Sequence, residues 1–233
     1  PTEVPYRANL WALRSLGVRW ILSVSAVGSL QEKNQPLDML VPDQFIDRTH
    51  QRPLSFFGDG LVAHVGVADP FCPVLSSILA DVGESLMPAG RTLHRGGTYL
   101  CMEGPAFSTR AESELYRSWG CAVIGMTNHT EARLAREAEI AYSTLAMVTD
   151  YDCWHQDHDA VTVEMVIENL RTNASLAQEI IAKAAQRIAA QRPASGAHHA
   201  LRHALMTAPE QVPAETRLRT DLFTSPYWGP YSS

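Results

Sequence analysis

The 233-residue sequence contains little positive charge and no cluster of it. Lys and Arg together number 19 against 25 Asp and Glu, which gives a formal net charge of −6. Nucleic acids and anionic membranes select basic surfaces, so neither is an expected partner of this chain. No apolar run approaches the roughly 20 residues that cross a bilayer, and no signal-peptide pattern opens the sequence. These absences favour a protein that acts on small molecules.

Cysteine pairs at metal-binding or redox spacing are also lacking. The four cysteines, Cys72, Cys101, Cys121 and Cys153, form no CxxC motif and stand in apolar or aromatic surroundings. This usage predicts buried, reduced thiols and a cytoplasmic location. No GxGxxG motif follows any predicted strand, which argues against a nicotinamide-dependent oxidoreductase.

What is present is a regular alternation of apolar strands and helices. Hydrophobic residues make up 45% of the chain, enough for the core of one large α/β domain. Helices are predicted over residues 5–16, from about 73, after Thr109, over 130–140 and over 161–191. Strands are predicted from Trp20 to Ser25-Ala26 and over 38–42, 98–104, 121–126 and 140–150, with a loop over 46–60. This order predicts an α/β sheet with helices on both faces.

Polar residues stand at the ends of the predicted strands. They are Ser25, Glu103, Met126-Thr127, and Asp150 with Asp152. Ligands of α/β sheets bind at the carboxyl ends of strands, so these side chains are expected to line one crevice. Two capping boxes, Thr109 with Glu112 and Asn128 with Glu131, predict helix starts beside it. Backbone N–H groups at those starts favour an anionic ligand.

A cluster of acids and histidines follows the last strand, in the string TDYDCWHQDHDA. His155, Asp157, His158 and Asp159 could in principle hold a metal ion. The segment is polar throughout and precedes a helix, where negative charge is favourable in any case. A solvated loop is therefore the preferred interpretation, and no metal site is predicted.

Asp150 and Asp152 are a different case, because they directly end an apolar strand. They alternate with Tyr151, so both carboxylates are expected on one side of the strand. Two half-buried acids side by side cannot both ionise cheaply, and the pKa of one rises. The neutral acid can then donate to a ring nitrogen while its ionised neighbour accepts from an amine. The pair predicts a clamp for a heterocycle such as adenine, through its N7 and N6.

Several longer strings carry a family resemblance. MEGPAFSTRAES, GMTNHTEARLARE and MVTDYDCW, preceded by DQFIDRT and ADPFCP, closely resemble the S-methyl-5′-thioadenosine phosphorylases, which belong to the trimeric branch of purine nucleoside phosphorylases. The resemblance covers residues from Pro1 to about Ile188. It implies a mixed central β-sheet flanked by helices, in a phosphorylase domain over 1–192 followed by a helical extension and irregular tail over 193–233. SPYWGPYSS, at the end of that tail, shows no pattern of regular structure.

The resemblance implies a reaction and its participants. Family members are pentosyltransferases of purine and methionine salvage that cleave methylthioadenosine with inorganic phosphate, giving adenine and 5-methylthioribose 1-phosphate. Phosphate is a co-substrate, and no metal or organic cofactor is expected. A homotrimer or hexamer is the expected assembly. Asp150 would act as the general acid at N7, while Asp152 serves N6.

The remaining site residues are implied in the same way. Phosphate contacts are expected from Ser25, Ala26 and Thr127, and Met126 would pack under the ribose. Phe107 and Ser108 would line the base pocket. Val163, Val166 and Ile167 resemble the methylthio pocket, although helix spacing alone also predicts them as core residues. His64 would reach the 5′ substituent in a neighbouring subunit.

Two departures from the family keep alternatives open. Asn128-His129-Thr130 stands where many relatives carry Thr-Val-Pro. The family's glycine-rich phosphate loop and its Arg-His pair are expected upstream of Pro1, so the N-terminal part of the natural chain is expected to be missing, unless the chain is a shortened homologue. The alternatives are a phosphorylase for 6-oxopurines, such as methylthioinosine, inosine or guanosine, and a non-catalytic trimeric purine-binding homologue.

Overall fold

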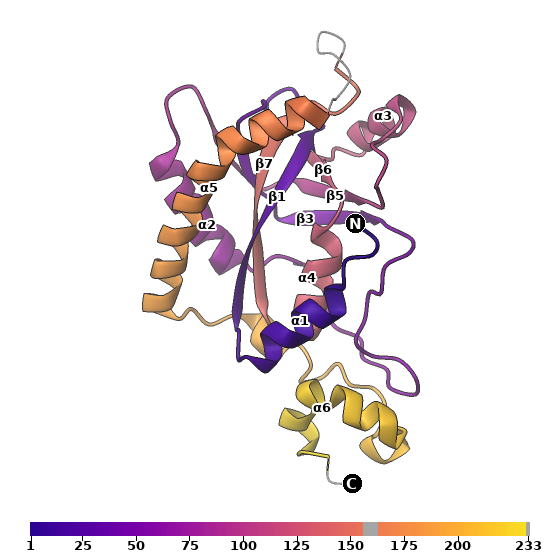
Figure 1. Ribbon diagram of the computed structural model, residues 1–233. Coiled ribbons are helices and arrows are strands. Elements are labelled where there is room, and N and C mark those ends of the chain that lie inside the picture. Colours follow the sequence, from indigo (N-terminus) through magenta and orange to yellow (C-terminus); the bar gives the residue numbers. More distant parts are fainter. Residues whose placement is uncertain (156–162, 232–233) are drawn as a thin grey trace.

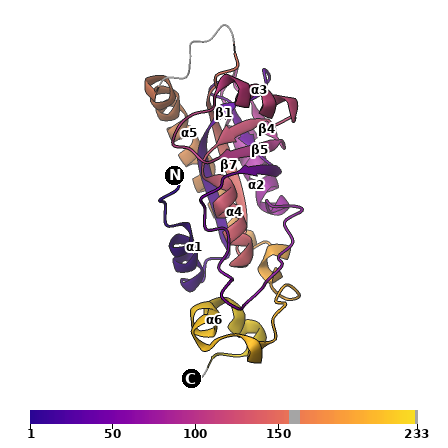
Figure 2. The ribbon, with the colours of Figure 1, turned by 90° about the vertical axis from the view of Figure 1, so that its right-hand side faces the viewer.

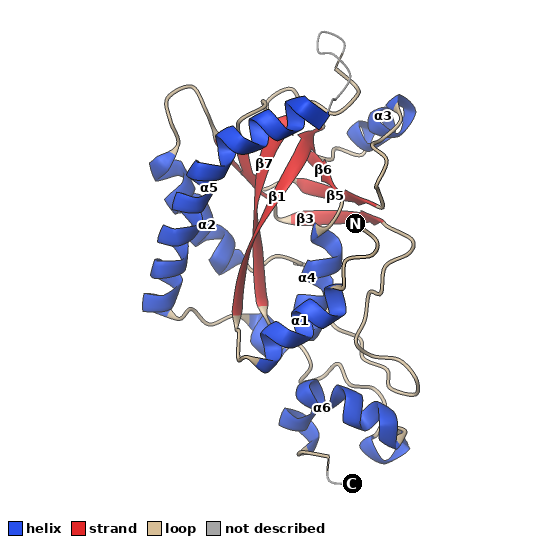
Figure 3. Cartoon of the chain, viewed as in Figure 1, coloured by secondary structure: helices blue, strands red, loops and turns tan. Residues whose placement is uncertain are grey.

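The computed structural model describes residues 1–155 and 163–231 (Figure 1). Across these residues the strands form one mixed sheet in the order β3-β5-β6-β1-β7-β2-β4, flanked by helices (Figure 3). The strands are β1 Trp20–Ser29, β2 Met39–Val41, β3 Gln44–Arg48, β4 Leu93–Arg95, β5 Thr98–Met102, β6 Val123–Gly125 and β7 Ala141–Asp150. The helices are α1 Tyr6–Ser15, α2 Pro73–Leu86, α3 Arg110–Ser118, α4 Asn128–Glu137, α5 Val163–Gln191 and α6 Ala214–Trp228, with short 3-10 turns η1 Gly196–His199 and η2 Pro209–Gln211. The predicted fold class, a mixed sheet flanked by helices, is confirmed.

Strand β7 is the centre of the core. All ten of its residues are buried, as expected for a strand covered on both faces. On one face Leu145 and Met147 pack with residues of α2 and α5. On the other, Tyr142 packs with residues of α1, α4 and α6. The two faces explain why this strand reads as a continuous apolar run.

The sheet consists of two parts with a narrow connection. β1 runs parallel to β7 along its length but pairs with β6, antiparallel, only at Gly28↔Ile124 and Ser29↔Val123. Among the described residues, Trp20–Val27 have no strand partner on the β6 side. The two parts diverge from this short junction. A crevice therefore opens between β1 and β6.

Several predicted boundaries were wrong. β1 continues to Ser29, so Ser25 and Ala26 lie within the strand and not at its end. The predicted loop over 46–60 contains the second half of β3, and β4 had no counterpart in the prediction. Both missed strands are short and partly polar. Their pairing with β5 and β2 stabilises them, whereas their own residue pattern does not announce them.

The C-terminal region is more regular than its sequence indicates. α6 includes Ser225–Trp228, which the sequence analysis took as irregular, and Pro226 lies in its last turns. The hydroxyls of Thr220 and Thr224 donate to carbonyls one turn earlier in the helix. Figure 2 shows this region at the end of the molecule opposite α3. No described helix has the length and apolar character that a membrane-spanning segment requires.

Candidate active site

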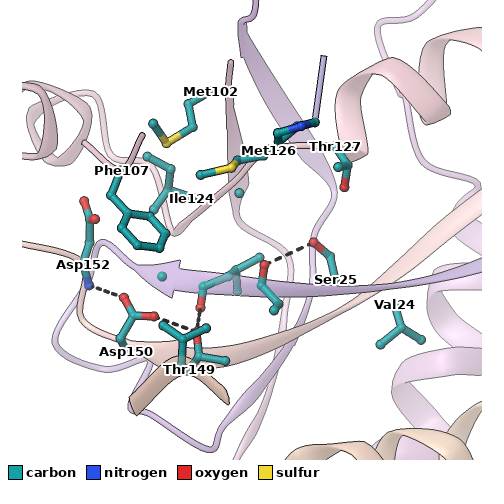
Figure 4. Close-up of a pocket in the computed structure, with 16 residues that line it drawn as sticks. Val24, Ser25, Met102, Phe107, Ile124, Met126, Thr127, Thr149, Asp150 and Asp152 are labelled. Atoms are coloured by element: carbon teal, nitrogen blue, oxygen red, sulfur yellow. Dashed lines mark hydrogen bonds between the residues drawn. The ribbon is translucent and has the colours of Figure 1, made fainter. Parts of the chain in front are cut away.

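A pocket of about 350 Å³ occupies the crevice between β1 and β6 (Figure 4). Strand β1 contributes one wall, the end of β7 the floor, and the segment after β6 the opposite wall. Its lining includes Pro1, Val24, Ser25, Ala26, Val27, Gly28, Met102, Phe107, Ile124, Gly125, Met126, Thr127, Thr149, Asp150, Asp152 and Val166. The fold thus brings together residues that lie up to 165 positions apart.

Most of the predicted site residues line this pocket. They are Ser25, Ala26, Phe107, Met126, Thr127, Asp150, Asp152 and Val166. The side chain of Val163 lies outside the described residues. The pocket is the one place in the described structure where both predicted carboxylates, the predicted phosphate contacts and an aromatic ring meet.

Four predicted residues do not line the pocket: Ser108, Ile167, His64 and Glu103. The Ser108 hydroxyl contacts the Met102 sulfur at 3.7 Å, so Ser108 lies behind a residue that does line it. Ile167 is 41% exposed on α5, next to Val166. His64 is exposed, and its backbone N–H donates to the Ala204 carbonyl, away from the pocket of its own chain.

The end of the pocket where phosphate contacts are predicted combines hydroxyls with a helix start. The Ser25 hydroxyl is 2.9 Å from the Tyr99 hydroxyl, and this contact fixes the Ser25 side chain against the wall that β1 forms. Thr127 is the residue at the N-cap of α4, and its side chain makes no capping hydrogen bond. The first turn of α4 therefore presents uncapped backbone N–H groups beside Thr127. Such a helix start attracts an anion.

The predicted cap at Asn128 was wrong. Asn128 lies inside the first turn of α4, is buried, and donates to the hydroxyls of Tyr142 and Thr144 on β7. The next residue, His129, is also buried, with Nδ1 3.2 Å from Asp47 Oδ2. Burial lowers the pKa of His129, although Asp47 opposes the shift. These side chains anchor the start of α4 to the sheet.

Glu103, predicted among the strand-end ligands, is not in the pocket lining. It accepts hydrogen bonds from the backbone of His50 and Gln51 and from the Arg52 guanidinium at 2.9 Å. Burial would raise the pKa of Glu103, but the donors, Thr2 among them, outweigh burial and lower it to about 2. Glu103 therefore holds the loop after β3 against the sheet.

Asp150 and Asp152 both line the pocket floor. Strand alternation, on which the prediction from the sequence rested, is not the cause, because β7 ends at Asp150 and Asp152 lies in the following turn with φ 53°. The Asp152 backbone N–H donates to Asp150 Oδ1 at 2.8 Å, and Asp150 Oδ2 is 2.6 Å from the Thr149 hydroxyl. Burial raises the pKa of Asp150. Burial, helped by the neighbouring Asp150, raises the pKa of Asp152 to about 6. Asp152 Oδ2 is buried without a hydrogen-bond partner among the described residues.

Gly28 is a pocket residue that the sequence analysis missed. A Cβ at this position would lie 3.0 Å from Asp150 Oδ1 and 3.2 Å from Ile124 Cγ2. A Cβ would therefore crowd both Asp150 and Ile124, and the close approach of β1 and β6 favours glycine here. Ile124 and Thr149 were also missed. Ile124 was recognisable in principle, because it lies two residues before Met126 on the same face of the predicted strand 121–126.

The structure describes only part of the acidic cluster for which a metal site was considered. His155 lies 3.3 Å from Glu32 and stacks on Tyr151 at 4.7 Å. Asp157, His158 and Asp159 lie outside the described residues. Among the residues that are described, no three His, Cys, Asp or Glu side chains gather as metal ligands would.

The family of the chain follows from comparison with known proteins. Residues 1–186 match the family described as the phosphorylase superfamily. The S-methyl-5′-thioadenosine phosphorylase of Prochlorococcus marinus is 68% identical over 232 residues, which cover 100% of this chain and 74% of that protein. The chain belongs to the S-methyl-5′-thioadenosine phosphorylase family. The family resemblance seen in the sequence is thereby confirmed.

Other members of this family support the assignment. The phosphorylase of the same name from Thermosynechococcus vestitus is 60% identical over 97% of this chain and 78% of its own length. The crystal structure of a methylthioadenosine phosphorylase from an Antarctic soil metagenomic library superposes with a TM-score of 0.91 at 55% identity, covering 96% of this chain and 78% of that one. An adenosine/methylthioadenosine phosphorylase from Schistosoma mansoni, solved with adenine, gives a TM-score of 0.77 at 37% identity over 82% of this chain and 73% of that one.

Proposed function

We propose that this chain catalyses the reversible phosphorolysis of S-methyl-5′-thioadenosine to adenine and 5-methylthioribose 1-phosphate. The observation that carries the proposal is the pair of buried carboxyls that lie side by side on the floor of the pocket. The names of the most similar relatives support the same reaction.

The acid pair suits the edge of an adenine ring. Asp152 Oδ2 is buried, and among the described residues no donor meets it with full hydrogen-bond geometry, although the nearby Ser113 hydroxyl lowers the pKa of Asp152. The exocyclic amine at N6 would supply a donor. A neutral Asp150 would protonate N7, which receives negative charge as the bond to C1′ lengthens. A 6-oxopurine would place an oxygen opposite the Asp152 acceptor. Asp152 Oδ2, as an acceptor, therefore favours a 6-aminopurine.

The opposite end of the pocket suits phosphate. Ser25, Ala26 and Thr127 line it, and α4 begins there. A phosphate dianion held at this end would lie beside the ribosyl cation that forms as the base departs, and would stabilise it electrostatically before bonding to C1′. Met126, between the two ends, would pack under the ribose. The proposed chemistry requires no metal or organic cofactor.

The 5′ end of the substrate is assigned to apolar side chains of α5 and to a neighbouring subunit. Val166 lines the pocket, and Val163 and Ile167 accompany it on the helix. We place the methylthio group against this helix. His64, exposed on its own chain, is proposed to reach the neighbour's pocket in a homotrimer. A cytoplasmic location is proposed from the four cysteines, all of which are free thiols.

Phosphate-dependent release of adenine from methylthioadenosine is the direct test. The chain should release adenine only when phosphate is present, and Asp150→Asn should lower kcat by about 100-fold or more, because general acids contribute factors of that size. Asp59→Asn is a matched control, since Asp59 is exposed at a left-handed backbone position that Asn tolerates.

Inosine and methylthioinosine should be assayed alongside. Turnover of only these substrates would transfer the assignment to the 6-oxopurine phosphorylases. Purine binding without any turnover would indicate a non-catalytic homologue.

A further inference from the structure

The Thr149 hydroxyl lies between two oxygen atoms on the floor of the pocket. Its Oγ1 is 2.6 Å from Asp150 Oδ2 and 3.1 Å from the Val27 carbonyl oxygen (Figure 4). A hydroxyl has one proton to donate, and a backbone carbonyl can only accept. If Thr149 donates to Val27, its contact with Asp150 contains a proton only when Asp150 supplies it. Two full hydrogen bonds therefore exist together only when Asp150 is neutral, because an ionised Asp150 would have to share the single Thr149 proton with Val27.

The rest of the Asp150 environment agrees with a proton on Oδ2. The other carboxylate oxygen, Oδ1, already accepts the Asp152 backbone N–H. Asp150 is 6% exposed, and burial raises its pKa. Among the described residues, no Lys, Arg or His forms an ion pair with it. The carboxyl therefore lacks a cation that would favour its ionised form.

The position of Thr149 is fixed by a β-bulge. Val27 is aligned with Val148 and Gly28 with Asp150, so Thr149 is the extra residue between them. Two asparagines of α5 hold the backbone here: Asn169 donates to the Thr149 carbonyl at 2.7 Å, and Asn173 to that of Val148 at 3.3 Å. The bulge turns the side chains of two consecutive residues toward each other, which a regular strand would not do.

We propose that Thr149 is a positioning residue that accepts a hydrogen bond from neutral Asp150 before the reaction and donates one to the Asp150 carboxylate that the reaction forms. This inference rests on the proposed phosphorolysis. As a phosphate oxygen bonds to C1′, the C1′–N9 bond breaks and its electron pair passes to the purine. The Oδ2 proton moves to N7, and the Thr149 O–H turns from Val27 to Oδ2. Adenine leaves carrying this proton, the new sugar phosphate releases the proton of the phosphate dianion to water, and Asp150 regains one from water, so the protons balance.

Only a hydroxyl can take both parts in turn, because it is an acceptor and a donor at the same atom. A hydrogen bond to a charged group is stronger than one between neutral groups. Thr149 therefore contributes more after the proton has left than before. Its removal should slow the chemical step and make Asp150 harder to ionise.

The test compares Thr149→Val with Thr149→Ser in the full chain. At saturating phosphate and nucleoside, Thr149→Val should lower kcat by about 10- to 100-fold, the loss expected of one hydrogen bond to a charged group. The alkaline limb of the kcat profile, where Asp150 loses its proton, should move to higher pH. Thr149→Ser should restore both properties. The KM for phosphate should stay unchanged, because Thr149 is on the base side.

A second measurement does not require turnover. Infrared difference spectra between the wild type and Asp150→Asn should show the C=O band of a protonated carboxyl at pH 7, and the band should persist to higher pH in Thr149→Val. If the wild type binds adenine but releases none from the nucleoside, the proposed function fails, and the band alone decides about Thr149. Absence of the band, an unmoved alkaline limb in Thr149→Val, or no rescue by Thr149→Ser would overturn the inference. If Thr149→Val does not fold, Thr149→Ala takes its place.

Discussion

At the scale of single residues, the buried carboxylate of Asp152 lowers the stability of the fold when it is ionised. The pKa of Asp152 rises from 3.8 in the unfolded chain to about 6 in the folded protein, chiefly by burial. A carboxyl with a raised folded pKa stabilises the fold fully below pH 4, and this contribution is lost as the pH rises through 6. The ionised side chain is therefore a stability cost at the pH where it would accept from adenine.

Replacement of Asp152 should reveal this cost. Asp152→Asn is expected to increase the free energy of unfolding by about 3 kcal/mol at pH 8, from a pKa shift of about two units, and to leave it nearly unchanged at pH 4. Urea unfolding at the two pH values measures the difference, with Asp59→Asn as the exposed control. An equal gain at both pH values would mean that the charge of Asp152 is not the cause.

At the scale of structural elements, the close approach of β1 and β6 at Gly28 sets the width of the pocket. Gly28→Ala would place a Cβ 3.0 Å from Asp150 Oδ1. The acid would have to shift by a few tenths of an ångström, so kcat/KM for nucleoside should fall about tenfold or more, as expected when a reacting group is displaced. Steady-state kinetics measure this ratio. Gly66→Ala is the control, since a Cβ at Gly66 meets nothing within 4 Å. An unchanged kcat/KM in Gly28→Ala would show that the side chains of the pocket floor adjust to the extra methyl group.

The elements also show what the sequence could predict. The capping box of Thr109 and Glu112 is confirmed in both hydrogen bonds, because all its partners lie within four residues. Asn128 looked equally suited to a cap, but the hydrogen-bond partners of its side chain, Tyr142 and Thr144, belong to strand β7. β1 and β7 were recognisable from their apolar runs. The bulge at Thr149 and the short strand β3 depend on pairing between distant segments, which no local pattern records.

At the scale of the whole molecule, the pocket lies at the junction of two sheet parts that share, within the described ranges, two aligned residue pairs. Ser25, Gly28 and Asp150 belong to one part, while Ile124 and Thr127 belong to the segment on the other. A ligand that contacts both parts should restrain their separation. Ligand binding is therefore linked to the local stability of the junction.

Hydrogen exchange measures this linkage. Adenine and phosphate together should slow amide exchange at Val123–Gly125 and at the end of β1, with little change in the distant helix α6. The protection should be weaker with either ligand alone, because each contacts fewer elements of the junction. Uniform protection across the molecule, α6 included, would contradict a local restraint and indicate global stabilisation only.

The β-bulge at Thr149 also decides whether a related or redesigned sequence retains the geometry of the site. Thr149 and Asp150 face each other because β7 has one residue more than its neighbour β1 at this point. A deletion that restored regular pairing could leave both residues in the sequence and still separate them in space. An alignment or a design that matches the residue types but removes the one-residue offset between β7 and β1 would therefore retain every named group of the site. It would lose the contact between Asp150 and the Thr149 hydroxyl.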